Sequence, residues 1–151
     1  MLIRADRFST LPEGCPVLVG DAVLPGTIRE PIGKGYRVAI AGAAPMAGGA
    51  PSTTIAWAPR MQVDLSTPAA VRAFAPALIA QLLPAGAVGT VAAIPDDLGQ
   101  WHLCIVYGQH DGGLHIRGYD AIRGACVVEA TPEACLLAGL KAALDAAKDA
   151  Q

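Results

Sequence analysis

The segment QHDGGLHIRG, residues 109 to 118, concentrates side chains that can do acid–base or metal chemistry. It holds His110, His115 and Arg117 in a chain that has 3 histidines in total. An imidazole titrates near neutral pH and ligates metals, whereas a guanidinium binds carboxylates and phosphates. The segment is therefore either part of a reactive site or a turn with polar residues around it.

The central Asp111-Gly112 pair is typical of a type I′ turn between two antiparallel strands. Such a turn would place Gly108 opposite His115, Val106 opposite Arg117 and Cys104 opposite Tyr119. One face of the hairpin would then be apolar and face the core. The other face would carry the polar residues, with His102 and His110 at its ends. If the chain is an enzyme or a ligand-binding protein, four residues of this face form the expected site: Cys104, His115, Arg117 and Tyr119. A solvated hairpin face is the alternative.

A metal or cofactor is not expected at this face. His102 would lie six residues, or roughly 20 Å, along the strand from Gly108, the residue opposite His115, which is too far to share a metal with His115. His110 and His115 could share one, but a closed site needs further ligands. The cysteines at 15, 104, 126 and 135 form no C-x-x-C pair, so we expect buried, reduced thiols. Nothing near Cys15 would activate it as a nucleophile.

One other short motif could bind an anion. GKGYR, residues 33 to 37, combines two glycines with two cations, which could hold a phosphate against backbone N–H groups. It lacks the complete phosphate-binding glycine motifs, so a hairpin turn is favoured. No G-x-S-x-G, H-E-x-x-H or EF-hand pattern occurs.

The composition favours one folded domain over residues 1–151, located in the cytoplasm. Of the 151 residues, 53% are hydrophobic and 16% charged, and the net charge is -2. This charge does not favour nucleic acid as a partner. The N-terminus has no apolar stretch of secretory length. Prolines and glycines interrupt the apolar stretch 73–95, which argues against a membrane span.

The pattern of elements predicts an α+β fold: an antiparallel sheet with a middle helix and a C-terminal helix packed on it. Strands are expected at 16–19, 22–24, 27–30, 36–41, 54–57 and 61–65. Four more are expected in a meander at 88–94, 101–107, 114–119 and 125–129. Thr67-Pro68 and Thr131-Pro132 predict the starts of the two helices. Pro76 should kink or split the first of them. The Gly/Pro/Ala-rich stretch 41–53 is expected to be a mobile loop.

Two features indicate a protein partner. On the C-terminal helix a band of small residues would allow close approach of another element, within the domain or across a dimer: Cys135, Gly139, Ala142, Ala143 and Ala146. Met46 and Trp57 flank the loop and could contact a guest segment. The residues predicted to bind a partner are Met46, Trp57, Gly139, Ala143 and Ala146.

Two stretches and the order of elements resemble a known family. FSTLPEG, from Phe8 to Gly14, and VVEATPEA, from Val127 to Ala134, are similar to segments of the PsbP-like α/β/α sandwich. Within that fold the chain looks most like the small chaperones that accompany type VI secretion effectors. The resemblance implies a homodimer that shields apolar segments of an effector and has no catalytic activity.

The favoured function is therefore a non-catalytic protein-binding module: a chaperone, adaptor or immunity protein for a secreted effector. The partner would be another polypeptide, either the effector or a second copy of the chain. A small enzyme or ligand-binding protein that uses His115, Arg117 and Tyr119 is one alternative. A phage or assembly structural protein is another.

Overall fold

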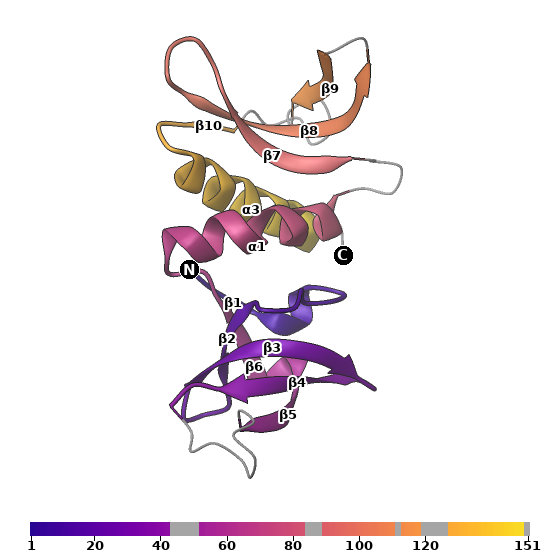
Figure 1. The fold of residues 1–151 in the computed structure, drawn as a ribbon, viewed down its shortest axis with the longest axis vertical. Coiled ribbons are helices and arrows are strands. Elements are labelled where there is room, and N and C mark those ends of the chain that lie inside the picture. Colours follow the sequence, from indigo (N-terminus) through magenta and orange to yellow (C-terminus); the bar gives the residue numbers. More distant parts are fainter. Residues whose placement is uncertain (43–51, 84–88, 111–112, 119–126, 150–151) are drawn as a thin grey trace. The chain divides into compact units, whose positions relative to one another are not determined.

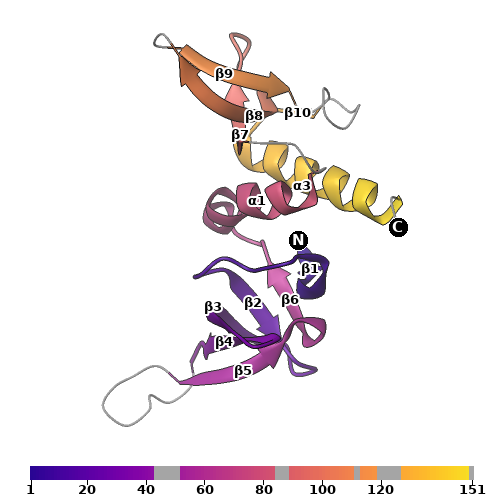
Figure 2. The same cartoon turned by 90° about the vertical axis from the view of Figure 1, so that its right-hand side faces the viewer.

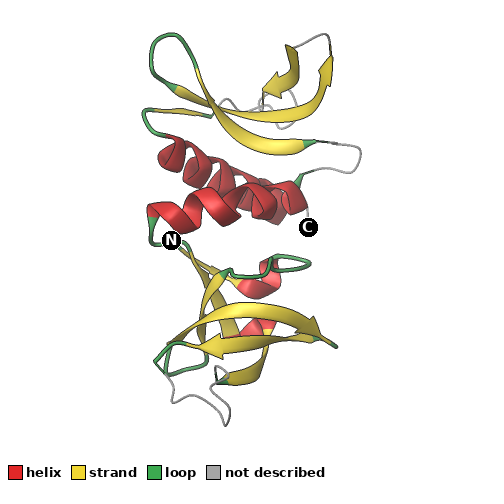
Figure 3. Ribbon diagram, in the orientation of Figure 1, coloured by secondary structure: helices red, strands yellow, loops and turns green. Residues whose placement is uncertain are grey.

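The computed structural model of the chain is α+β, as predicted, with helices and two antiparallel sheets (Figure 1, Figure 3). The structure describes residues 1–42, 52–83, 89–110, 113–118 and 127–149, and of these it describes 107–117, 148 and 149 by backbone only. The chain divides into two compact units, Met1–Ala70 and Val71–Gln151, where the composition favoured a single domain. The predicted mobile loop lies almost entirely outside the described residues.

The first unit is a six-stranded antiparallel sheet in the order β1-β6-β2-β3-β4-β5 (Figure 2). Its strands are β1 (Leu2–Arg4), β2 (Pro16–Val19), β3 (Leu24–Ile32), β4 (Gly35–Ile40), β5 (Thr53–Trp57) and β6 (Met61–Asp64). Short 3-10 helices follow β1 and β5: η1 (Ala5–Arg7) and η3 (Ala58–Arg60). The strands predicted at 16–19, 36–41, 54–57 and 61–65 are confirmed, whereas β1 was not predicted. Although β5 and β6 are consecutive in the chain, β6 pairs with β1 and β2, and β5 with β4.

The turns of this sheet differ from the prediction at one place. Val19 pairs with Leu24, so the loop after β2 has four residues, Gly20 to Val23, instead of two. The predicted strand 22–24 is therefore wrong, because Val23 lies in the loop with a φ of 47°. The predicted turn in GKGYR is confirmed, since Ile32 pairs with Gly35 and Gly33 has a φ of 56°. Glycine adopts this left-handed conformation without strain, but valine does not.

The first unit has its own apolar core. Alternate residues of the central strands are fully buried, which is the period-two pattern of a sheet with one covered face: Val17, Ile28, Val38, Met61 and Val63. Tyr36 extends this core with its ring, and its hydroxyl accepts a hydrogen bond from the Leu11 backbone N–H at 3.1 Å. A buried tyrosine that finds such a partner incurs no desolvation penalty for its polar end.

The second unit carries both long helices, α1 (Pro68–Leu82) and α3 (Pro132–Asp149). The predicted starts are confirmed: the Thr67 hydroxyl accepts a hydrogen bond from the Ala70 N–H at 3.2 Å, and Thr131 caps Ala134 in the same way at 3.1 Å. An ion pair between Arg72 and Glu133 joins the two helices. Pro76 lies inside α1 without interrupting it, so the helix is not split.

The sheet of the second unit is centred on β8 (Trp101–His110). One edge of β8 pairs with β7 (Thr90–Pro95). The other edge pairs with both β9 (Gly113–Gly118) and β10 (Val128–Glu129). The predicted meander is therefore wrong in its last step, because β10 returns to β8 at Trp101 and His102 instead of pairing with β9. Trp101 and His102, at the start of β8, lie outside the pairing with β9, and the short strand β10 pairs with them instead.

Helix α3 packs closely on this sheet. A Cβ atom placed on Gly139 would lie 2.4 Å from Leu103 Cδ2, so any larger residue at position 139 would displace the Leu103 side chain. Three residues of the predicted small-residue band are buried on α3, and three leucines are buried beside them: Cys135, Gly139 and Ala143, with Leu136, Leu140 and Leu144.

Candidate functional site

The β8–β9 hairpin confirms part of the predicted register and corrects the rest. His115 lies opposite Gly108, as predicted. The register then shifts by one residue between Val106 and Gly108, so Arg117 lies opposite Ile105 and not Val106. A bulge places one extra residue on one strand, and no sequence pattern predicted it here. Tyr119 and Asp111-Gly112 lie outside the described residues.

The shift breaks up the predicted polar row. Cys104 lies opposite Gly118 instead of Tyr119, and Cys104 is itself buried, with 6% of its surface exposed. The predicted pairing of Cys104 with Tyr119 is therefore wrong, whereas the burial of the Cys104 thiol agrees with the expectation for the cysteines. For His110, His115 and Arg117 the structure gives only the backbone register, so the catalytic role of His115 and Arg117 stays a prediction.

His102 forms a polar pair that the sequence analysis missed. Its Nε2 lies 2.7 Å from Asp96 Oδ2, and Asp96 Oδ1 accepts hydrogen bonds from the N–H groups of Leu98 and Gln100 at 2.8 and 3.0 Å. The hydrogen bond from His102 is the main cause that lowers the pKa of Asp96, and the two backbone bonds add to it. Aspartate often accepts a hydrogen bond from the backbone N–H two residues further on, so Asp96 in the turn segment PDDLGQ was a local signal for this turn, although not for the contact to His102.

The pair organises the β7–β8 turn but does not form a recognisable reaction centre. Within the described residues, no group of three or more His, Cys, Asp or Glu side chains is placed to hold a metal ion. Asp96 uses both of its oxygens to hold the turn and His102, which is the pattern of a structural aspartate.

The described cysteines are free and buried, as predicted: Cys15, Cys104 and Cys135. Burial raises the pKa of the Cys15 thiol to about 12 and that of Cys135 to about 11. Since the thiolate is the nucleophilic form, neither group is activated at neutral pH. Cys126 lies outside the described residues.

The residues predicted to bind a partner separate into two groups. Gly139 and Ala143 are buried within the chain, so the close approach that the small-residue band permits is used at Gly139 for packing against β8. Ala146 is partly exposed. Met46 lies outside the described residues. Trp57, in contrast, is a large apolar residue with 52% of its surface exposed.

Trp57 belongs to a strand at the edge of the first sheet. Within the described residues, β5 pairs with β4 alone. The Ile40 N–H donates to the Ser52 carbonyl at 3.0 Å, and hydrogen-bonded positions alternate along an antiparallel ladder. The backbone groups of Thr54 and Ala56 therefore point toward β4, whereas those of Thr53, Ile55 and Trp57 point away from it. We call these last three residues the β5 edge.

The side chains of the β5 edge lie on the outer face of the sheet. Ile55 and Trp57 are 49% and 52% exposed, whereas Ala56 between them is buried on the core side. Trp57 lies opposite Gly35, and a Cβ on Gly35 would come within 2.8 Å of Trp57 Cε3. The indole ring thus lies against Gly35, and about half of the Trp57 surface remains open to solvent.

Comparison with protein-family models, with curated proteins and with solved structures finds no match to this chain. The PsbP-like resemblance therefore stays a prediction. Of the helices in the described ranges, none has the length and apolar character needed to cross a membrane.

Proposed function

We propose that this chain is a non-catalytic protein-binding module that captures an extended segment of a partner polypeptide along the β5 edge. One observation carries the proposal: at Ile55 and Trp57, backbone groups that point away from β4 coincide with exposed apolar side chains. A peptide that adds a strand to a sheet gains affinity from main-chain hydrogen bonds and specificity from alternate side chains.

The composition of β5 supports this proposal. Proteins commonly protect a free edge with lysine, proline or a very short strand, because an unprotected edge pairs with other chains. β5 reads TTIAW and has neither a charged residue nor a proline. The opposite edge of the sheet, β1, has only 3 residues and carries Arg4. β5 is thus the edge of this sheet that is open to a further strand.

Trp57 supplies the anchor for such a segment. Tryptophan is among the residues most often found at binding hot spots, where a large rigid surface becomes buried. Because Gly35 supports the ring, Trp57 loses little freedom when a partner covers it. The PsbP-like resemblance suggests the partner class: an apolar segment of a secreted effector. The module would then act as a chaperone, adaptor or immunity protein.

The test uses overlapping peptides from the proteins encoded beside this gene. Ile55→Pro removes the outward N–H of β5 and no bond to β4, so the sheet should persist. Ile55→Ala keeps that N–H and removes only the side chain. For a bound peptide we expect Ile55→Pro to weaken affinity by about tenfold or more, and Ile55→Ala by less, since backbone pairing supplies most of the affinity. Trp57 fluorescence, read in a Trp101→Phe background, measures the binding.

Two outcomes would overturn the proposal. The first is a peptide that binds with the same affinity to the wild type, Ile55→Pro and Trp57→Ser when calorimetry, which needs no tryptophan, measures all three. The second is a chain that binds no peptide and sediments as a dimer that Ile55→Pro dissociates, because the edge would then be occupied by a second copy.

A further inference from the structure

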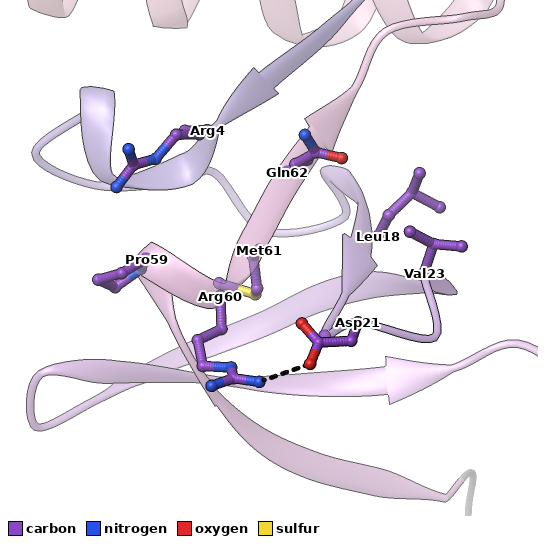
Figure 4. Close-up of a pocket in the computed structure, with 9 residues that line it drawn as sticks. Arg4, Leu18, Asp21, Val23, Pro59, Arg60, Met61 and Gln62 are labelled. Carbon is purple, nitrogen blue, oxygen red and sulfur yellow. Dashed lines mark hydrogen bonds and ion pairs between the residues drawn. The ribbon is translucent and has the colours of Figure 1, made fainter.

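A pocket of about 330 Å³ lies in the first unit, away from the strand pairing of β5 (Figure 4). The four-residue loop after β2 forms one side of it, and η3 with the start of β6 forms the other. Its lining combines charged and apolar side chains: Arg4, Leu18, Asp21, Val23, Pro59, Arg60, Met61 and Gln62, together with Gly20. This volume is at the small end of the range for ligand sites, about 300–1,000 Å³.

Of the two arginines in this lining, Arg60 forms the longer ion pair with its carboxylate partner. Its Nη2 lies 3.4 Å from Asp21 Oδ2, and the Asp21 side chain is 98% exposed. Such an exposed, long ion pair contributes little to stability, because water competes for both groups. Arg4, the second cation of the lining, pairs with Asp6, which does not line the pocket. A ligand oxyanion with better geometry could therefore replace Asp21 at Arg60.

The loop that carries Asp21 is held in a strained conformation. Val23 has a φ of 47°, which a β-branched residue rarely adopts. Two backbone hydrogen bonds maintain it: Val23 N–H to the Gly20 carbonyl at 3.1 Å, and Gly20 N–H to the Arg60 carbonyl at 2.8 Å. Strain of this kind is concentrated at sites that clamp ligands. Here it leaves Val23 54% exposed at the pocket.

We infer that this pocket binds a small organic anion. Its oxyanion, a carboxylate or a phosphate ester, pairs with the Arg60 guanidinium in place of Asp21. Its short apolar part lies against Val23 and Leu18, and Arg4 adds positive charge to the lining. The inference uses none of the residues of the β5 edge, so the failure of either proposal leaves the other standing.

The test titrates the isotope-labelled full chain with pentanoate, pentyl phosphate, pentanol and pentyltrimethylammonium at constant ionic strength. We expect saturable shifts of the backbone amide signals of Gly20, Asp21 and Val23 with one or both anions, and none with the alcohol or the cation. The two anions distinguish a carboxylate site from a phosphate site. Arg60→Gln should weaken the binding by about tenfold, because it removes the paired charge.

Two controls separate a site from general attraction. Arg37→Gln removes the same charge from an arginine that pairs with Glu30 on the sheet, and it should leave the affinity unchanged. Asp21→Asn removes the competing carboxylate and should strengthen binding several-fold, whereas Asp97→Asn, which removes a charge elsewhere, should not. The inference is wrong if neither anion gives saturable shifts at about 10 mM, or if Arg60→Gln and Arg37→Gln weaken binding equally.

Discussion

At the scale of single residues, Asp96 shows how one side chain can determine a turn. It accepts two backbone hydrogen bonds inside the β7–β8 turn and a third from His102 on β8. Leu98, at the tip of this turn, is almost fully exposed. The turn is therefore ordered by polar contacts and not by burial of its apolar residue, which ties its stability to the charge of Asp96.

Asp96→Asn should reduce the stability of the chain at neutral pH but not in acid. The pKa of Asp96 is lowered from 3.8 in the folded chain, so its charged form stabilises the fold above that pH. This contribution is lost as the pH falls through the lowered pKa. The thermal midpoints of wild type and Asp96→Asn should differ above about pH 5. They should converge as the pH falls through the lowered pKa of Asp96.

Asp97→Asn is the matched control for this pH dependence, because it removes the same charge from the same turn without changing the contact to His102. A gap between wild type and Asp96→Asn that stays constant down to the lowest pH would show that the charge of Asp96 does not hold the turn.

At the scale of elements, the two prolines of α1 occupy opposite environments. Pro68 is the first residue of the helix, where the missing N–H has no partner to lose. Pro76 lies in the interior, where a residue other than proline would donate to the Arg72 carbonyl. The helix continues through Pro76 because Val71, Ala75, Leu78 and Ile79 bury a continuous apolar face.

Pro76→Ala should therefore stabilise the chain. Alanine restores one hydrogen bond of the helix and removes the steric conflict of the ring, which together are worth about 1–3 kcal/mol. Pro68→Ala should change the free energy of unfolding by less than about 0.5 kcal/mol, since position 68 tolerates proline. Urea unfolding of the two variants measures the difference. Equal effects of both substitutions would contradict this reading of the helix.

At the scale of the whole molecule, the strand pairing of the first unit is internal to that unit. All partners of its six strands lie between Leu2 and Asp64. The two ends of this segment are tied together, because the Leu65 N–H donates to the Met1 carbonyl at 2.9 Å and the Met1 amino group to the Leu65 carbonyl at 3.2 Å. A segment of this size can fold alone if its core is complete.

The fragment from Met1 to Ser66 should therefore fold without the rest of the chain. We expect its amide spectrum to be dispersed and to overlay the corresponding signals of the full chain, except near the new C-terminus. Val63→Asp, which places a charge in the core, should abolish this dispersion. A collapsed spectrum of the unsubstituted fragment would show that the first unit depends on the second.

Local features of the sequence were sufficient to predict most elements. Thr67-Pro68 and Thr131-Pro132 predicted both helix starts, because capping involves only neighbouring residues. The strand expected at 61–65 is equally local, because apolar and polar residues alternate there and Met61, Val63 and Leu65 are buried. Trp57 was also predicted to contact a partner. The structure adds that Trp57 belongs to an edge strand and that its ring lies against Gly35.

The sequence by itself thus determined where helices and strands form and which of their faces are apolar, since these properties depend on residues a few positions apart. Only the tertiary structure decided which segments meet. It packed Gly139 against Leu103, placed Arg117 opposite Ile105 through a bulge in the strand register, and placed Asp21 beside Arg60. These contacts join residues that are far apart in the chain, and their geometry depends on the packing of whole elements, which no local pattern records.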